Sequence, residues 1–276
     1  MSFLKKIFEF YVFSNLHVAV AGFCLVKISL LKFGQKESFV PLFVALSIVL
    51  SYNFIRFYEL KTKRVIWLKE WFNKHKLTLL ILSLAAFVGF FSIFFFTNFN
   101  QISVFCLMPF FVITFFYVIP IYRSRKFEFS FRNFPIIKIF SIAISWAGIT
   151  VFFPLVEVEF KLNIDVYLEF FQRFLILIAI TLPFDIRDLE CDPKEMKTLP
   201  QIFGVKKSKS IGLLLLILFV LFEFLKEGGD LISTSLIAVI AGFFLKFTNE
   251  YQTRYYTAFW VESVPVFWLF LIILFL

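Results

Sequence analysis

Nine apolar windows, each of about 20 residues, follow one another along this chain and restrict the folds open to it. They cover residues 11–33, 38–58, 77–97, 102–122, 135–157, 165–185, 208–227, 229–247 and 256–276. A helix of that length crosses the hydrocarbon core of a bilayer, and 61% of the 276 residues are hydrophobic. We therefore predict an all-α, polytopic membrane bundle of nine transmembrane helices, formed by one integral membrane domain over residues 1–276.

The first window is read either as a cleavable leader or as a retained helix. Lys5 and Lys6 precede the apolar run, and Ala19-Val20-Ala21 places small residues at the spacing of a signal-peptide cleavage site. The run nevertheless continues from Tyr11 to Leu31, which is longer than the apolar region of a signal peptide. We expect a retained first span.

Positive charge is distributed unevenly between the two sides of the predicted bundle. Of the 28 Lys and Arg residues, 22 fall on the side of the amino terminus, counting helix ends with their connections. Membrane proteins concentrate these residues in cytoplasmic loops. We expect a cytoplasmic amino terminus, an outer carboxyl terminus and a location in the cell (cytoplasmic or inner) membrane. The same asymmetry explains the net charge of +9, so the expected partner is membrane lipid and not nucleic acid.

An acidic stretch follows the sixth window, from Pro183 to Pro193. Asp185, Asp188 and Asp192 are spaced i, i+3, i+7, which places them on one helical face where the span meets water. Such carboxylates repel one another unless a cation neutralises them. Oxygen ligands without a nearby His or Cys pair favour Mg²⁺ over Zn²⁺, and a bound metal can hold a diphosphate. The alternative is a solvated helix end, because Asp is common at membrane boundaries.

Two other connections on the cytoplasmic side combine polar and aromatic residues. Asn53 and Arg56 share one helical face at the end of the second window. Residues 65–72, which follow it, mix Trp and Phe with Lys, as a helix in the membrane interface does. The alternatives are an interhelical hydrogen bond for Asn53 and lipid contact for Arg56. Tyr117 and Arg123 lie on either side of a proline-broken helix end, where the cations suit anionic lipid or a pyrophosphate.

Ionisable and polar residues also occur inside the predicted spans, where charge is costly and usually faces a partner. Glu169 and Arg173 are spaced i, i+4 and are able to pair, in a structural or a catalytic role. His17 is isolated, which favours a hydrogen-bonded packing histidine over a ligand. The remaining members of this group are Asn15, Lys27, Lys32, Gln172 and Glu223.

The acidic stretch resembles a known sequence motif. Asp185-x-x-Asp188-x-Glu190-x-Asp192, followed by Lys197-Thr198-Leu199-Pro200 and Gly204, is similar to the second aspartate-rich motif of the UbiA-type intramembrane prenyltransferases. The predicted nine helices and the Tyr-x-x-Pro with its basic loop after the fourth window resemble that family too.

The resemblance implies a magnesium-dependent enzyme that moves an isoprenyl group from its diphosphate to a lipophilic acceptor, by default an aromatic quinone precursor. It implies that Asp185, Asp188 and Asp192 hold the metal and that Lys197 touches phosphate. It also implies that Tyr117 and Arg123 line the site.

This chain departs from the family's first aspartate-rich motif. Its opening Asn53 is present, but Phe54, Phe57 and Lys61 occupy the three acidic positions. One hypothesis is that Arg56 supplies positive charge to phosphate in place of one Mg²⁺, since guanidinium pairs well with phosphate oxygens.

The second hypothesis is a catalytically impaired UbiA-fold protein with a lipid-binding, isoprenoid-binding or assembly role. Loss of one metal removes several kcal/mol of transition-state stabilisation. A transporter or channel is less favoured, because no pair of Gly-broken or Pro-broken helices occurs in corresponding halves.

Overall fold

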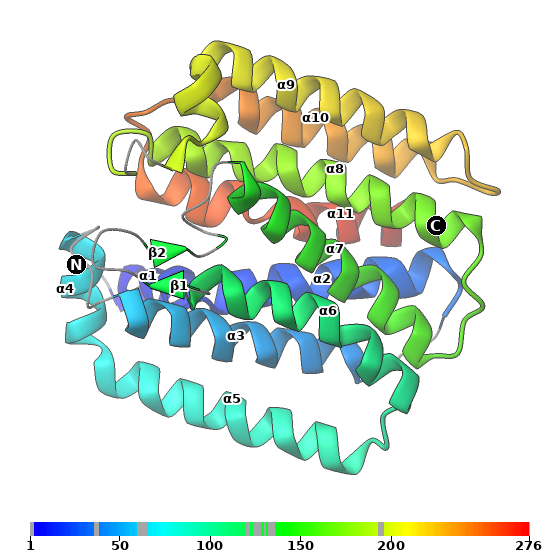
Figure 1. Ribbon diagram of the computed structural model, residues 1–276, viewed down its shortest axis with the longest axis horizontal. Coiled ribbons are helices and arrows are strands. Elements are labelled where there is room, and N and C mark those ends of the chain that lie inside the picture. The colour runs from blue at the N-terminus through cyan, green and yellow to red at the C-terminus, as the bar shows by residue number, and fades with distance from the viewer. Residues whose placement is uncertain are drawn as a thin grey trace.

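The computed structural model describes residues 3–35, 39–59, 66–119, 122–123, 128–129, 131, 136–192 and 196–275 (Figure 1). Within these ranges the fold is helical apart from one short antiparallel ribbon. The helices are α1 (Phe3–Phe13), α2 (Leu16–Lys32), α3 (Val40–Glu59), α4 (Ile66–Lys74), α5 (Lys76–Phe96), α6 (Gln101–Val118), α7 (Ile137–Glu157), α8 (Ile164–Arg187), α9 (Leu199–Glu223), α10 (Leu231–Phe247), the π-helix η3 (Tyr256–Val261) and α11 (Val264–Phe275). The ribbon pairs β1 (Tyr122–Arg123) with β2 (Glu128–Phe129).

Each predicted apolar window contains a described helix, so the all-helical prediction is confirmed. Within the described ranges, five helices are long and apolar enough to cross a membrane: α3, α5, α7, α8, and η3 continued by α11. A sixth span results if α1 and α2, which meet at a bend of 58°, are taken together. Helices α6 and α10 are shorter apolar helices. The fold is thus a bundle of apolar helices of membrane-spanning length.

Helix α9 differs from its predicted window, because it begins at Leu199 and not near residue 208. Thr198 and Gln201 form a capping box, and Pro200 lies in the first turn, where a missing N–H costs nothing. Gly204 then takes a φ of 77°, which interrupts the helix. A polar, kinked segment therefore precedes the apolar part of α9.

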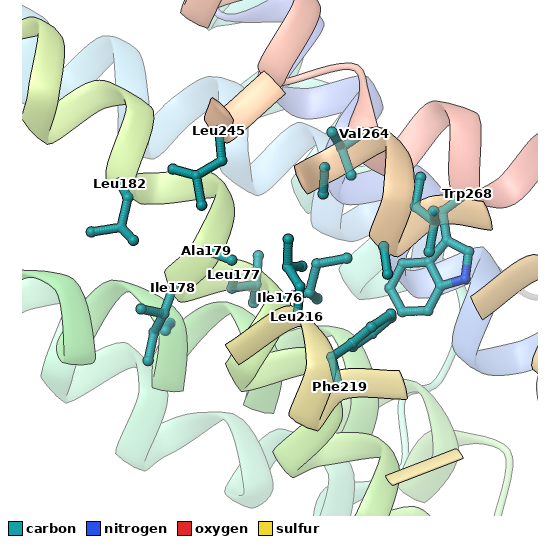
Figure 2. Packing of buried hydrophobic residues seen from close by; sticks show 14 of the residues in the cluster. Ile176, Leu177, Ile178, Ala179, Leu182, Leu216, Phe219, Leu245, Val264 and Trp268 are labelled. Atoms are coloured by element: carbon teal, nitrogen blue, oxygen red, sulfur yellow. The ribbon is translucent and has the colours of Figure 1, made fainter. Parts of the chain in front are cut away.

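The main core lies around α8, which packs between α7 and α9 and also contacts α10 (Figure 1). Helices α2 and α11 complete this core. Figure 2 shows Phe219 of α9 beside Trp268 of α11; their rings lie edge to face with centroids 5.4 Å apart. Because both side chains are fully buried, this pair fixes α9 against α11.

Helix α5 lies at the edge of the bundle beside α3 (Figure 1). Of its 21 residues, only Leu79 and Ala86 are buried, although its sequence is almost entirely apolar. An apolar helix that leaves most of its surface unburied suits lipid and not water. This arrangement supports a membrane environment.

A buried charged network crosses the first half of α8. Arg173 donates to Glu169 at 2.8 Å, which confirms the predicted pair. Lys32 lies 3.2 Å from Glu169 and 3.3 Å from Glu223, and Lys226 lies 3.0 Å from Glu223. The network joins α2, α8 and the end of α9.

His17 has the structural contacts expected of a packing histidine. Its ring nitrogens lie 2.9 Å from the Tyr11 hydroxyl and 3.0 Å from the Phe259 carbonyl oxygen, and Nε2 is 3.1 Å from the Ser263 hydroxyl. These bonds tie the break between α1 and α2 to η3.

Candidate functional site

The bundle contains a cavity of about 290 Å³ lined by α2, α3, α6, α7, α8 and the region where η3 meets α11. Leu177, Thr181 and Asp185 line it at intervals of four residues, so one face of α8 runs along its length. From Leu177 to Asp185 the helix rises about 12 Å. The cavity therefore has an apolar part among the helices and a charged part at the carboxyl end of α8.

Two carboxylates at the end of α8 converge on one cation. The Lys138 ammonium, in the first turn of α7, lies 2.8 Å from Oδ1 of Asp185 and 3.1 Å from Oδ2 of Asp192. Asp185 is only 2% exposed. Backbone bonds from Cys191 and Asp192 to the Asp188 carbonyl oxygen, at 2.9 and 2.8 Å, turn the chain back after the helix. This turn brings Asp192 to the same point as Asp185.

Asp188 has a different partner. Arg187 makes a bidentate contact with its carboxylate: Nε donates to Oδ1 at 2.7 Å, and Nη2 donates to Oδ2 at 2.8 Å. The remaining Arg187 terminal nitrogen donates to the Thr257 hydroxyl at 2.6 Å. Asp188 thus lines the cavity with Arg187 and not with Lys138.

The charged side chains of the cavity nearly balance. Three cations face four carboxylates, a formal charge of −1 for the described lining: Arg56, Lys138 and Arg187 against Asp185, Asp188, Asp192 and Glu262. An anionic ligand entering this lining needs an additional cation, because charges in a low-dielectric site are not screened by water.

The arrangement of Asp185 and Asp192 fits a small oxygen-bound cation. Mg²⁺ is commonly held through one or two carboxylates together with substrate phosphates, and these two carboxylates already share the single point where the Lys138 ammonium lies. Mg²⁺ that displaces this ammonium would be held by Asp185 and Asp192. Among the described residues, no group of three His, Cys, Asp or Glu side chains converges as a metal site, and magnesium binding stays a prediction.

Two of the other predicted site residues lie in the cavity. Arg56 of α3 and Tyr117 of α6 both line it, on helices that flank α2 and α7. Lys197 is exposed and does not line the cavity. The backbone of Arg123 belongs to β1, whereas its side chain and all of Lys61 lie outside the described residues.

Asn53 lies in the helix packing and not in the cavity lining. It is 1% exposed, accepts a hydrogen bond from the Asn15 amide at 2.8 Å and donates to the Ser83 hydroxyl at 3.1 Å. The interhelical hydrogen bond, one of the two alternatives for this residue, is the arrangement observed. Asn53 links α3 to the break before α2 and to α5.

Three residues of the charged part were not among the predicted site residues. Lys138 lies near the start of the fifth apolar window. Arg187 lies inside the acidic stretch, and Glu262 is an ionisable residue within the last apolar window. The cost of charge at membrane depth is the signal that could have identified Glu262, which was not among the sequence-based predictions.

No family model, no curated protein and no solved structure matches this chain. The chemistry of the site therefore has to be inferred from its own geometry. That geometry combines an apolar chamber, a pair of carboxylates sharing one cation position, and two guanidinium groups in the same cavity.

Proposed function

We propose that this chain is a UbiA-type intramembrane prenyltransferase, which moves an isoprenyl group from its diphosphate to an aromatic or quinone-precursor acceptor. The observation that carries the proposal is the continuous lining from the apolar face of α8 to its acidic end. An isoprenyl diphosphate has the same division, with a hydrocarbon tail and an anionic head. The acidic stretch that resembles the family's second motif supplies the charged part of that lining.

The headgroup contacts follow from the charges. Arg56 and Arg187 both line the cavity, so each brings a positive charge that attracts phosphate oxygens. Mg²⁺, when bound by Asp185 and Asp192, would supply the positive charge that stabilises a departing diphosphate. The Lys138 ammonium, once released from these carboxylates, is close enough to pair with the same headgroup.

The apolar part of the cavity would hold the tail and the reacting carbon. Its walls come from the three helices α2, α7 and α8: Val18, Ala21, Ile142, Trp146, Leu177 and Ile180. Such walls exclude water, which would otherwise capture an allylic cation before the acceptor does. The rings of Trp146 and Tyr52 line the same space and are able to stabilise that cation by cation–π attraction.

We also propose how the chain is oriented in the membrane. We propose nine spans, one for each apolar window, in the cell membrane with a cytoplasmic amino terminus. In that orientation the carboxyl end of α8 faces the cytoplasm, where phosphorylated substrates are found. The lysine and arginine distribution supports this orientation.

Calorimetry on purified protein tests the headgroup site. Inorganic pyrophosphate is expected to bind in the presence of Mg²⁺, and Asp185→Asn and Asp192→Asn are expected to lose that binding. Glu190→Gln is the matched control, because Glu190 belongs to the same stretch but is exposed and outside the cavity lining. Equal binding by all four proteins would reject the site.

A second candidate function rests on Asn53. Because this residue is used in helix packing, Asn53 itself does not serve as a ligand in the described part of the family's first motif. A catalytically impaired UbiA-fold protein would keep the cavity and bind an isoprenoid lipid without reaction. It would bind an isoprenyl diphosphate but release no pyrophosphate over many hours.

A further inference from the structure

Glu262 is a cavity carboxylate that the headgroup site does not use. It follows the π-helix η3, and its backbone N–H donates to the Thr257 carbonyl oxygen at 3.2 Å, five residues earlier. Such wide turns often occur at functional sites, because they shift side chains away from their regular helical positions. Val261 and Glu262 both line the cavity as a result.

The other three cavity carboxylates each contact a cation directly, whereas Glu262 only lies in the electrostatic field of Arg187 and Arg56. Asp185 and Asp192 pair with Lys138, and Asp188 pairs with Arg187. Among the residues that the structure describes, no ion pair within 4.0 Å and no side-chain hydrogen bond involves the Glu262 carboxylate. A carboxylate in a cavity without such a partner has free acceptor oxygens.

The position of Glu262 relative to the headgroup site is fixed by Arg187. The Arg187 side chain donates to the Thr257 hydroxyl, on the π-turn that carries Glu262, and its other nitrogens hold Asp188. Glu262 therefore lies beside the charged end of the cavity, while Val261 and Pro265 continue the apolar wall on its own segment.

We propose that Glu262 is the general base that takes the proton from the acceptor, an inference that rests on the proposed function. The allylic C–O bond breaks with its electron pair leaving on the diphosphate. The acceptor's ring carbon forms a C–C bond to the allylic carbon, and the proton on that ring carbon passes to a Glu262 oxygen. Release of product returns this proton to water.

The test separates binding from proton removal in the detergent-purified full chain. Glu262→Gln keeps the shape of the side chain and loses the base. Geranylgeranyl diphosphate is the donor, and a hydroxybenzoate or dihydroxynaphthoate is the acceptor. We expect pyrophosphate to bind at least as tightly as in wild type, because the variant removes a negative charge from the cavity, and the single-turnover transfer rate to fall by a factor of about 10² to 10⁴. Glu262→Asp keeps the carboxylate and should recover part of the rate.

A kinetic isotope effect distinguishes a base from a structural residue. With the acceptor deuterated at the reacting ring carbon, Glu262→Gln should show a larger effect than wild type, because proton removal becomes rate-limiting. Transfer by Glu262→Gln at the wild-type rate would overturn the inference, and so would loss of pyrophosphate binding in that variant. If wild type neither binds nor releases pyrophosphate, the proposed function itself has failed.

Discussion

The Lys138 ammonium lies 2.8 Å from a carboxylate oxygen of Asp185, although the two residues are 47 positions apart in the chain. This contact joins the first turn of α7 to the last turn of α8 and brings a cation to the acidic end. The same ammonium lies 3.1 Å from Asp192. Lys138 is therefore both the neutralising partner of these carboxylates and a competitor for any metal that they bind.

Replacement of Lys138 should change metal and anion binding in opposite directions. Lys138→Met leaves Asp185 and Asp192 without their cation, so Mg²⁺ alone should bind more tightly, by about tenfold, since a charge-assisted bond is worth about 1.5–3 kcal/mol. Pyrophosphate affinity in saturating Mg²⁺ should fall. Isothermal calorimetry measures both, with Lys197→Met as the control because Lys197 is exposed. Weaker Mg²⁺ binding in Lys138→Met would contradict this role.

Arg56 should contribute to the headgroup and not to the metal. Arg56→Ala removes a guanidinium group from the cavity lining, and pyrophosphate affinity should fall by about tenfold or more, as expected for a charged hydrogen-bonding partner. The affinity for Mg²⁺ alone should not fall, because Asp185 and Asp192 are retained. The same calorimetric titrations compare Arg56→Ala with wild type. Wild-type pyrophosphate affinity in this variant would remove Arg56 from the site.

The buried network at the first half of α8 should be essential for stability. Glu223 accepts hydrogen bonds from Lys32, Gln172 and Lys226, so Glu223→Gln leaves buried cations under-neutralised. Removing one partner of a buried pair typically costs about 3–5 kcal/mol. A thermal unfolding assay in detergent should show a clearly lower Tm.

Glu227→Gln is the control for that experiment, because Glu227 is exposed four residues further along. Its Tm should stay at the wild-type value. Equal transitions for Glu223→Gln and Glu227→Gln would mean that the network contributes little to stability.

The helices could be predicted from the sequence because apolar runs of bilayer length have few alternative structures. The predicted windows coincide with helices α2, α3 and α5 to α11. The ends of the helices were predicted less well than their existence. Helix α9 begins at Leu199, before its predicted window, because Thr198 and Gln201 form a polar capping box that a hydropathy pattern does not detect. The number of membrane spans was also hard to predict from hydropathy, because α6 and α10 are shorter apolar helices.

The site was predicted in part, from the spacing of the acidic stretch and from the positions of Arg56 and Tyr117, which also line the cavity. Asp185, Asp188 and Asp192 all line the cavity as their closeness in sequence predicted, but α8 ends at Arg187, so a turn and not a shared helical face brings Asp192 beside Asp185. The sequence could not reveal that Lys138 pairs with two of them, because that contact depends on how α7 packs on α8. The helix-packing role of Asn53 depends in the same way on Asn15 and Ser83 in other elements.

Release of pyrophosphate from an isoprenyl diphosphate by the purified protein tests the central proposal most directly. Geranyl, farnesyl and geranylgeranyl diphosphates are each incubated with wild type and with Asp185→Asn, with and without Mg²⁺, in the presence of a hydroxylated aromatic acceptor. We predict release and prenylated product with at least one donor, in wild type with Mg²⁺ only. No release from any donor, or equal release by Asp185→Asn, would contradict the proposed prenyl transfer.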